Sequence, residues 1–296
     1  MAHHDEHAEG TYFVPAYSKL PFFTALALFL IGYGSLNLVD PSTFGIVVFM
    51  LGAVAIAGVL FAWFKETIKE SKAGLHDEQM MRSYRWGMFW FLFADFMLFG
   101  IMYMGYFYAK HMSVADMAGI GGFDASVSGH YLLWPNFKYA WPLLVNPNPT
   151  AFAGSLGALN PWGFPALNMV LMLLSSVCVY FSFKKMQAHK RKLAITGLVF
   201  TLVLGFLFVF SQILSMMLAS SLLGLKMSSG IYGSLLFMIT GLHLGHVIVA
   251  WLVLFAVTLR AIFGAFDKDM FALQAATWFW MFLTFIFVLM FLLVYL

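Results

Sequence analysis

Seven long apolar runs, separated by polar or Gly- and Pro-rich stretches, dominate the hydropathy pattern of this 296-residue chain. Each run is long enough to cross a hydrocarbon core of ~30 Å as a helix, and none alternates in the way a strand does. Because lipid offers the backbone no hydrogen-bond partners, helices are the only form these runs can take. The runs are Pro21–Val39, Phe44–Phe64, Trp86–Ala109, Pro165–Phe183, Leu193–Leu218, Tyr232–Leu259 and Phe271–Leu296. The pattern predicts an all-α, polytopic membrane protein with seven transmembrane helices.

Composition excludes a soluble domain. Hydrophobic residues make up 62% of the chain, charged residues 10%, and the mean hydropathy is +0.87, so there is too little polar surface to cover a globule in water. The single cysteine, Cys178, lies inside an apolar run and can support neither a disulfide framework nor a cysteine-based metal site. The N-terminus lacks a basic region followed by an apolar one, so no cleaved signal peptide is expected.

Basic residues predict the orientation. Placing the N-terminus inside puts thirteen of the sixteen Lys and Arg residues in cytoplasmic segments and only Lys110, Lys138 and Lys226 outside. The thirteen are Lys19, Lys65, Lys69, Lys72, Arg82, Arg85, Lys184, Lys185, Lys190, Arg191, Lys192, Arg260 and Lys268. We therefore expect a multi-pass protein of the cell membrane with a cytoplasmic N-terminus and a periplasmic C-terminus. The small positive net charge is a topology signal and indicates no nucleic-acid partner.

The spacing of the runs predicts the domain organisation. A short connection makes the first two helices a hairpin, and a charged segment then separates that hairpin from the other five helices. Trp134, Trp141 and Trp162 indicate an ordered cap at the outer interface rather than a loose insertion. The expected parts are a cytoplasmic tail (1–20), a hairpin (21–64), a cytoplasmic charged segment (65–85) and a five-helix bundle (86–296) with an external cap (111–164).

Asp95 is the one acidic residue inside an apolar run. At about 1.5 Å per residue it lies roughly 15 Å from Arg85, near the bilayer midplane. A carboxylate there costs about 2.5–3.5 kcal/mol, so we expect it to face protein, water or a bound polar group. Two roles stay open: a protonatable group, or an acid that only hydrogen-bonds between helices. Arg82 and Arg85 lie where the same helix meets the headgroups, a position suited to phosphate.

His243 and His246 are three residues apart and share one helix face. They cannot clamp a haem from both sides, and no third histidine or glutamate lies at membrane depth, so we expect no metal site. Each is expected to donate a hydrogen bond to a neighbouring helix or a lipid ester, with Gly241 and Gly245 allowing close backbone approach. Ala2-His3-His4 could chelate copper weakly only if Met1 were removed, and a solvated tail is the preferred interpretation.

Five stretches, taken together and in order, resemble subunit III of the haem-copper terminal oxidases of the cytochrome c oxidase type. They are TYFVPAYSKLP, FAWFKETIKESKAGLHDEQMMRSYRWGM, LNPWGFPALN, the pattern GS..F..TG.H..HV at Gly233–Val247, and AATWFWMF. The Gly233–Val247 pattern is the most specific, and the resemblance extends over nearly the whole chain.

The resemblance implies a non-catalytic subunit without a redox centre of its own. It implies a proton-pumping complex in which this chain flanks catalytic subunit I, which holds the haems and one copper, beside subunit II. It also implies that helices 1–2 and 3–7 form a V whose cleft binds phospholipid, and that the subunit sustains proton uptake and the stability of subunit I. Cytochrome c or quinol would be the electron donor to the complex.

Site residues follow from the resemblance one at a time. Glu70, His76, Arg85 and Arg260 fall on family positions associated with lipid headgroups, and Trp63 on a tryptophan pair whose second member is here Phe64. Asp95 falls on the family's buried glutamate, and His243 and His246 fall on the two histidines of helix 6. The expected lipid-binding set is Trp63, Phe64, Glu70, His76, Arg82, Arg85 and Arg260.

Departures mark a divergent bacterial member. FSFKK ends helix 4 where the family has a histidine pair, Ser215 and Met216 replace a Glu-Tyr, and Met281 and Thr284 replace a His and an Asp. Two other functions remain as alternatives. One is the third subunit of a quinol oxidase, which tends to lack the N-terminal hairpin. The other is an ion transporter or channel, which the absence of inverted repeats and broken helices disfavours.

Overall fold

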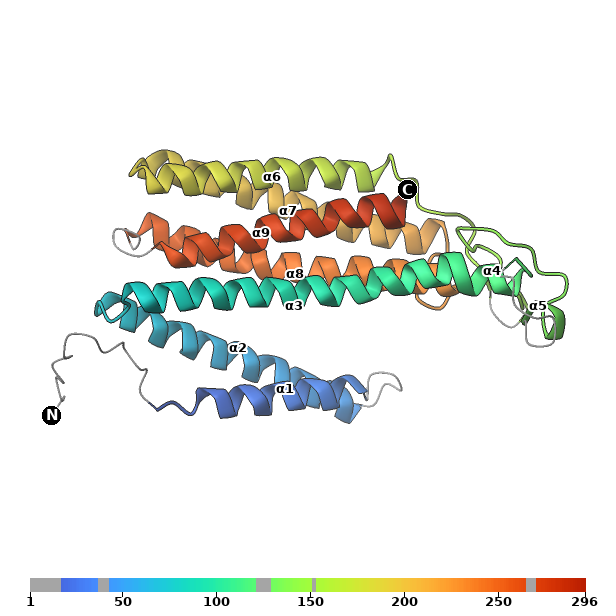
Figure 1. The fold of residues 1–296 in the computed structure, drawn as a ribbon, viewed down its shortest axis with the longest axis horizontal. Helices are drawn as coiled ribbons and strands as arrows, with labels where there is room; N and C mark the ends of the chain where they lie inside the picture. Colours follow the sequence, from blue (N-terminus) through green and yellow to red (C-terminus); the bar gives the residue numbers. More distant parts are fainter. Residues whose placement is uncertain (1–16, 37–42, 121–128, 151–152, 265–269) are drawn as a thin grey trace. The chain divides into compact units, whose positions relative to one another are not determined.

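The computed structural model describes residues 17–36, 43–120, 129–150, 153–264 and 270–296, and these residues form helices and loops without a strand (Figure 1). The helices are α1 (Leu20–Leu36), α2 (Thr43–Lys72), α3 (Glu78–Tyr108), α4 (Val114–Met117), α5 (Gly129–Leu132), α6 (Phe164–Gln187), α7 (Arg191–Leu222), α8 (Ile231–Ile262) and α9 (Phe271–Met290). Two π-helical turns, η1 (Ala109–Ser113) and η2 (Phe291–Tyr295), extend α3 and α9. The all-α prediction is confirmed for the described residues.

Among the described residues, six helical stretches are long and apolar enough to cross a membrane: α2, α3 with its extension to Met117, α6, α7, α8, and α9 with η2. The remaining apolar helix, α1, has 17 residues, which at 1.5 Å each is about 25 Å. A polytopic membrane protein is therefore confirmed. Seven crossings remain a prediction.

The two helices beside the charged segment are longer than their apolar runs. α2 continues through Lys72 and α3 begins at Glu78, so only residues 73–77 form the turn between them. Lys and Glu are good helix formers, and Lys69 lies 3.5 Å from Glu66 one turn away. Gly74, with φ at +76°, ends α2, and the Asp77 carboxylate accepts the Met80 N–H at 2.7 Å to begin α3.

The chain divides into two compact units, Met1–Trp86 and Gly87–Leu296. In the first, α1 packs against α2. A Cβ added at Gly34 would lie 2.5 Å from the Phe49 nitrogen, and one added at Gly52 would lie 2.7 Å from the Ile31 nitrogen. Only the missing side chains of these two glycines let the helices lie so close.

In the second unit, α6, α7, α8 and α9 close a ring of antiparallel helices, since α6 packs on both α7 and α9, and α8 on the same two (Figure 1). The buried face of α6 carries Asn168, Ser175 and Ser182 at intervals of seven. Asn168 Nδ2 donates to Gln212 Oε1 at 2.7 Å, and Trp280 Nε1 donates to Ser175 Oγ at 2.9 Å. Polar side chains thus join helices inside the ring.

α3 joins this unit through long side chains. The Tyr103 hydroxyl donates to the Ile286 carbonyl at 2.9 Å, and the Tyr106 hydroxyl donates to the Val294 carbonyl at 3.2 Å. The face of α3 that contains Asp95 and Phe99 therefore lies against the bundle. This contact positions the candidate site.

The described part of the external segment is fastened to the same unit. Trp141 donates from Nε1 to the Tyr106 hydroxyl at 3.0 Å and packs edge-on against Tyr232. Asn146 Nδ2 donates to the Ser229 carbonyl at 3.2 Å. Trp162, by contrast, is 75% exposed. Two of these contacts involve α3 and the first turn of α8, so the segment covers one end of the bundle.

Candidate functional site

The most unusual polar contact in the membrane-spanning part is between Asp95 of α3 and His246 of α8. Asp95 is 8% exposed, and its Oδ1 lies 3.3 Å from His246 Nε2. Phe99, one turn further along α3, packs edge-on against the His246 ring with centroids 5.4 Å apart. Sequence reasoning named both residues but did not pair them, because 150 residues of chain separate them and only packing brings their helices together.

Hydrogen-bond geometry limits how this pair can hold protons. His246 Nδ1 lies 2.8 Å from the Leu242 carbonyl oxygen. A carbonyl can only accept, so Nδ1 carries a proton. Nε2 then meets Asp95 as an acceptor if the ring is neutral, or as a donor if the ring is charged. In either form the Asp95–His246 contact needs one shared proton, held on the carboxyl or on the imidazole.

The second carboxyl oxygen of Asp95, Oδ2, is buried and has no hydrogen-bond partner among the described residues. An unsatisfied carboxylate oxygen in a low-dielectric setting is costly. The arrangement is chemically capable of holding and releasing one proton.

His243 has a different environment from His246. Its ring is fully buried, and Nε2 donates to the Leu283 carbonyl of α9 at 2.9 Å. Phe99, Phe208 and Phe287 surround it. His243 therefore bonds to a neighbouring helix as expected, whereas His246 bonds to its own helix and to α3.

The expectation that Gly241 and Gly245 allow close backbone approach is wrong for the described residues. A Cβ added at either would meet nothing within 4 Å. Each lies two residues, or about 200° around the helix, from a buried position such as His243 or Val247. The packed face of α8 is thus roughly opposite to its glycine face.

Among the described residues, no group of three or more His, Cys, Asp or Glu side chains could hold a metal ion. Ala2-His3-His4 lies outside the described residues. The Asp95–His246 pair supplies only two potential ligands.

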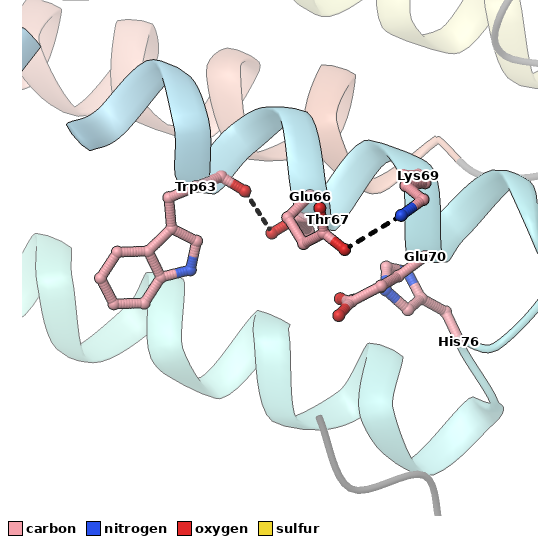
Figure 2. Close-up of polar contacts among 6 residues, drawn as sticks. All are labelled: Trp63, Glu66, Thr67, Lys69, Glu70 and His76. Atoms are coloured by element: carbon pink, nitrogen blue, oxygen red, sulfur yellow. Dashed lines mark hydrogen bonds and ion pairs between the residues drawn. The ribbon is translucent and has the colours of Figure 1, made fainter. Parts of the chain in front are cut away.

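The expected lipid-binding residues of the first unit cluster near the turn between α2 and α3. Glu70 Oε2 lies 3.9 Å from His76 Nε2, and Figure 2 shows the His76 ring alongside the Glu70 side chain, with Trp63 two turns back along α2. His76 also packs edge-on against Tyr84. Trp63 and Phe64 are 42% and 59% exposed. The carboxylate–imidazole pair thus lies about two turns along α2 from the exposed Trp63 ring.

The three expected arginines lie at helix ends. Arg82 and Arg85 are exposed on the first two turns of α3. Arg260 is half-buried on the last turn of α8, in the second unit. A basic rim for lipid headgroups stays a prediction.

Comparison with known proteins identifies the family of this chain. The family model described as "Cytochrome c oxidase subunit III" matches residues 10–126 and 148–296. The cytochrome c oxidase subunit 3 of Pylaiella littoralis is 29% identical, covering 88% of this chain and 92% of the relative. A probable cytochrome c oxidase subunit 3 of Rickettsia bellii is 25% identical, covering 94% and 92%. That of Enteroctopus dofleini is 30% identical, covering 76% and 94%. The chain belongs to the cytochrome c oxidase subunit III family.

Proposed function

We propose that this chain is the non-redox core subunit of a proton-pumping haem-copper cytochrome c oxidase, lying against catalytic subunit I beside subunit II. The family match over residues 10–126 and 148–296 carries the proposal. Membership implies a complex with other oxidase subunits. Oxygen reduction belongs to the haems and copper of the partners, and this chain contributes protein surface, lipid contacts and one buried acid–imidazole pair.

Phospholipid binding is the first proposed task. Trp63, Glu70 and His76 combine an exposed ring with polar groups at the end of a long apolar helix. Aromatic rings and charged groups at that level suit the glycerol and phosphate region of a lipid. Phe64, Arg82, Arg85 and Arg260 complete the proposed lipid-binding set, and the lipid would occupy the cleft that the family resemblance implies.

Support of proton uptake is the second proposed task. In this proposal Asp95 and His246 share one proton. The Asp95 side chain is 8% exposed and lies about ten residues along α3 from Arg85. Such a pair can buffer charge near a neighbouring proton path without being a redox group. We propose that it helps sustain turnover of subunit I.

The proposed orientation has the N-terminus in the cytoplasm and the C-terminus in the periplasm of a bacterial cell, with seven crossings. The bias of Lys and Arg toward one set of loops supports it. A cysteine introduced after Lys190 should then be labelled by an impermeant maleimide only from the cytoplasmic side.

A tag on this chain tests the main proposal. Purified gently in mild detergent, the tagged chain should bring down a complex with haem and copper spectra, while the isolated chain should be colourless. Haem or metal bound to the pure chain would contradict the proposal. A colourless chain that purifies without an oxidase and conducts ions in vesicles would favour a transporter or channel, and co-purification with a quinol-oxidising complex would favour the quinol-oxidase subunit.

A further inference from the structure

The turn that joins α6 to α7 is the most basic stretch of the described chain. Within residues 184–192, here called the basic turn, the cationic or imidazole side chains are Lys184, Lys185, His189, Lys190, Arg191 and Lys192. The sequence has no Asp or Glu between Asp124 and Asp267. The basic turn therefore carries no acidic residue that could neutralise it locally.

The charged segment 65–85 has a different charge balance. It has the same number of Lys and Arg residues, five, but also Glu66, Glu70, Asp77 and Glu78, and Lys69 pairs with Glu66 at 3.5 Å. Within the described part of the chain, the recorded ion pairs involve no residue of the basic turn. A topology signal requires only Lys and Arg on one side of the membrane. The basic turn itself contains no acid, and no acidic side chain of the described residues pairs with it, so its lysines are available to an external anion.

The backbone of the basic turn is ordered by hydrogen bonds. The His189 N–H donates to the Met186 carbonyl at 3.0 Å and the Lys190 N–H to the Lys185 carbonyl at 2.9 Å, the Schellman pattern that ends many helices. His189 takes the left-handed position with φ at +57°, the only described non-glycine residue with positive φ. Glycine would adopt this conformation at lower cost. An imidazole, which can carry a positive charge, therefore occupies the position where glycine is usual.

Arg191 fastens the turn to a third helix. Its Nε donates to the Ala261 carbonyl at 3.1 Å and its Nη2 to the Ile262 carbonyl at 2.7 Å, at the C-terminus of α8. A guanidinium there satisfies the last carbonyls and complements the helix dipole. The guanidinium of Arg191 is thus hydrogen-bonded within the protein. The four lysines, Lys184, Lys185, Lys190 and Lys192, lie on a turn that these bonds hold in place.

The residues around the lysines are those typical of a membrane surface. Lys184 Nζ lies 5.8 Å from the centre of the Tyr180 ring, one turn back along α6, and the exposed apolar residues Phe181 and Leu193 flank the turn on α6 and α7. Tyr and Lys in this order along a membrane helix are typical of the headgroup region. An anion that meets these lysines is at the height of a lipid phosphate.

We propose that the basic turn binds the phosphate of an anionic phospholipid headgroup. Charge complementarity, the ordered backbone and the position at the ends of two membrane helices all point to this occupant. The proposed site shares no residue with the lipid-binding set of Trp63, Glu70 and His76, and it does not depend on the oxidase function.

Photolabelling tests the proposal in the intact complex. The complex is reconstituted in phosphatidylcholine vesicles that contain a trace of photoreactive phosphatidylglycerol or of photoreactive phosphatidylcholine with the same reactive group. Peptides that include residues 184–192 should be labelled several-fold more by the anionic lipid. The variant Lys184→Gln/Lys190→Gln/Lys192→Gln should lose that excess, since each lysine near an anionic surface contributes about five-fold in affinity. Excess inorganic phosphate should leave the labelling unchanged, which distinguishes a lipid from a free phosphate.

The matched control removes three lysines elsewhere. Lys65→Gln/Lys69→Gln/Lys72→Gln should keep the excess labelling of 184–192, because those lysines lie among acids. If the triple variant of the basic turn does not fold, the single variant Lys190→Gln should still reduce the excess by about five-fold. Equal labelling by both lipids, an unchanged excess in the variants, or crosslinking of the turn to another polypeptide in place of lipid would overturn the proposal.

Discussion

In the two-helix unit, the backbones of α1 and α2 come into close contact at Gly34 and Gly52, which have no side chains. In the five-helix unit, the helices contact one another through large aromatic rings and hydrogen bonds. The described buried residues of α1 and α2 are Ala27, Gly34, Gly45, Val48 and Gly52, all small and apolar. Those of α6–α9 include Asn168, Gln212, His243 and Trp280.

The contrast shows two ways to hold helices together where burial from water contributes little. Small residues allow extensive van der Waals contact, and polar side chains supply interhelical hydrogen bonds. The first depends on shape alone and fails when a methyl group is added. The second depends on particular atoms and fails when a donor is removed. The two units should therefore respond to opposite kinds of substitution.

The largest effect is expected from His243→Ala. It removes the bond to the Leu283 carbonyl and leaves a cavity among Phe99, Phe208 and Phe287. We expect a loss of about 3 kcal/mol, the range of large-to-small core substitutions, measured as a lower midpoint of thermal unfolding in detergent. His111→Ala, at an exposed position, is the control. Equal midpoints for both variants would contradict the importance of the His243 contact.

Adding a methyl group at Gly34 should open the two-helix unit. Because the obstacle is the backbone of Phe49, the helices must separate, at a cost of about 2 kcal/mol. Spin labels on exposed positions of α1 and α2 should report a longer interhelical distance in Gly34→Ala. In Gly32→Ala, where an added Cβ meets nothing within 4 Å, the distance should be unchanged. An unchanged α1–α2 distance in both variants would show that close contact at Gly34 does not hold the two helices together.

Asp95→Asn and Asp95→Leu separate the hydrogen-bonding and protonic roles of the acid. The side-chain amide of Asn can still donate an N–H to His246 Nε2, so the complex should assemble with its haems at a cost of about 1 kcal/mol or less, but should lose activity faster during turnover. Leu cannot bond to His246 and should also weaken assembly. If Asp95→Asn sustains turnover as long as the natural protein, the acid has only a structural role.

The smallest effect is expected from His189→Gly. Relief of the left-handed conformation at φ +57° should stabilise the C-terminus of α6 by about 0.5–1 kcal/mol, seen as a slightly higher unfolding midpoint. Gly74→Ala, at φ +76° with nothing within 4 Å, is the reciprocal control and should lower it by a similar amount. A destabilised His189→Gly would mean that the imidazole makes a stabilising contact worth more than the strain.

Part of the site could be anticipated from sequence. A lone acid in an apolar run, as at Asp95, or histidines on one helix face indicate polar contacts inside the membrane whatever their partners are. Which atoms meet could not be anticipated. Gly241 and Gly245 carry the same small-residue signal as Gly34 and Gly52, yet only the second pair lies at a helix contact.

By itself, the sequence determined the helical class, the order of the membrane helices, the family, and the identity of the polar residues at depth. The free energy of transferring some twenty apolar residues into lipid is larger than the other local contributions to the free energy of folding. The backbone in lipid also has no alternative to a helix. Only the tertiary structure decided that Asp95 contacts His246, that α2 and α3 extend into the charged segment, and that Arg191 caps α8. Each of these depends on how a helix is rotated about its axis and where it ends, and those are set by packing against neighbours far away in the chain.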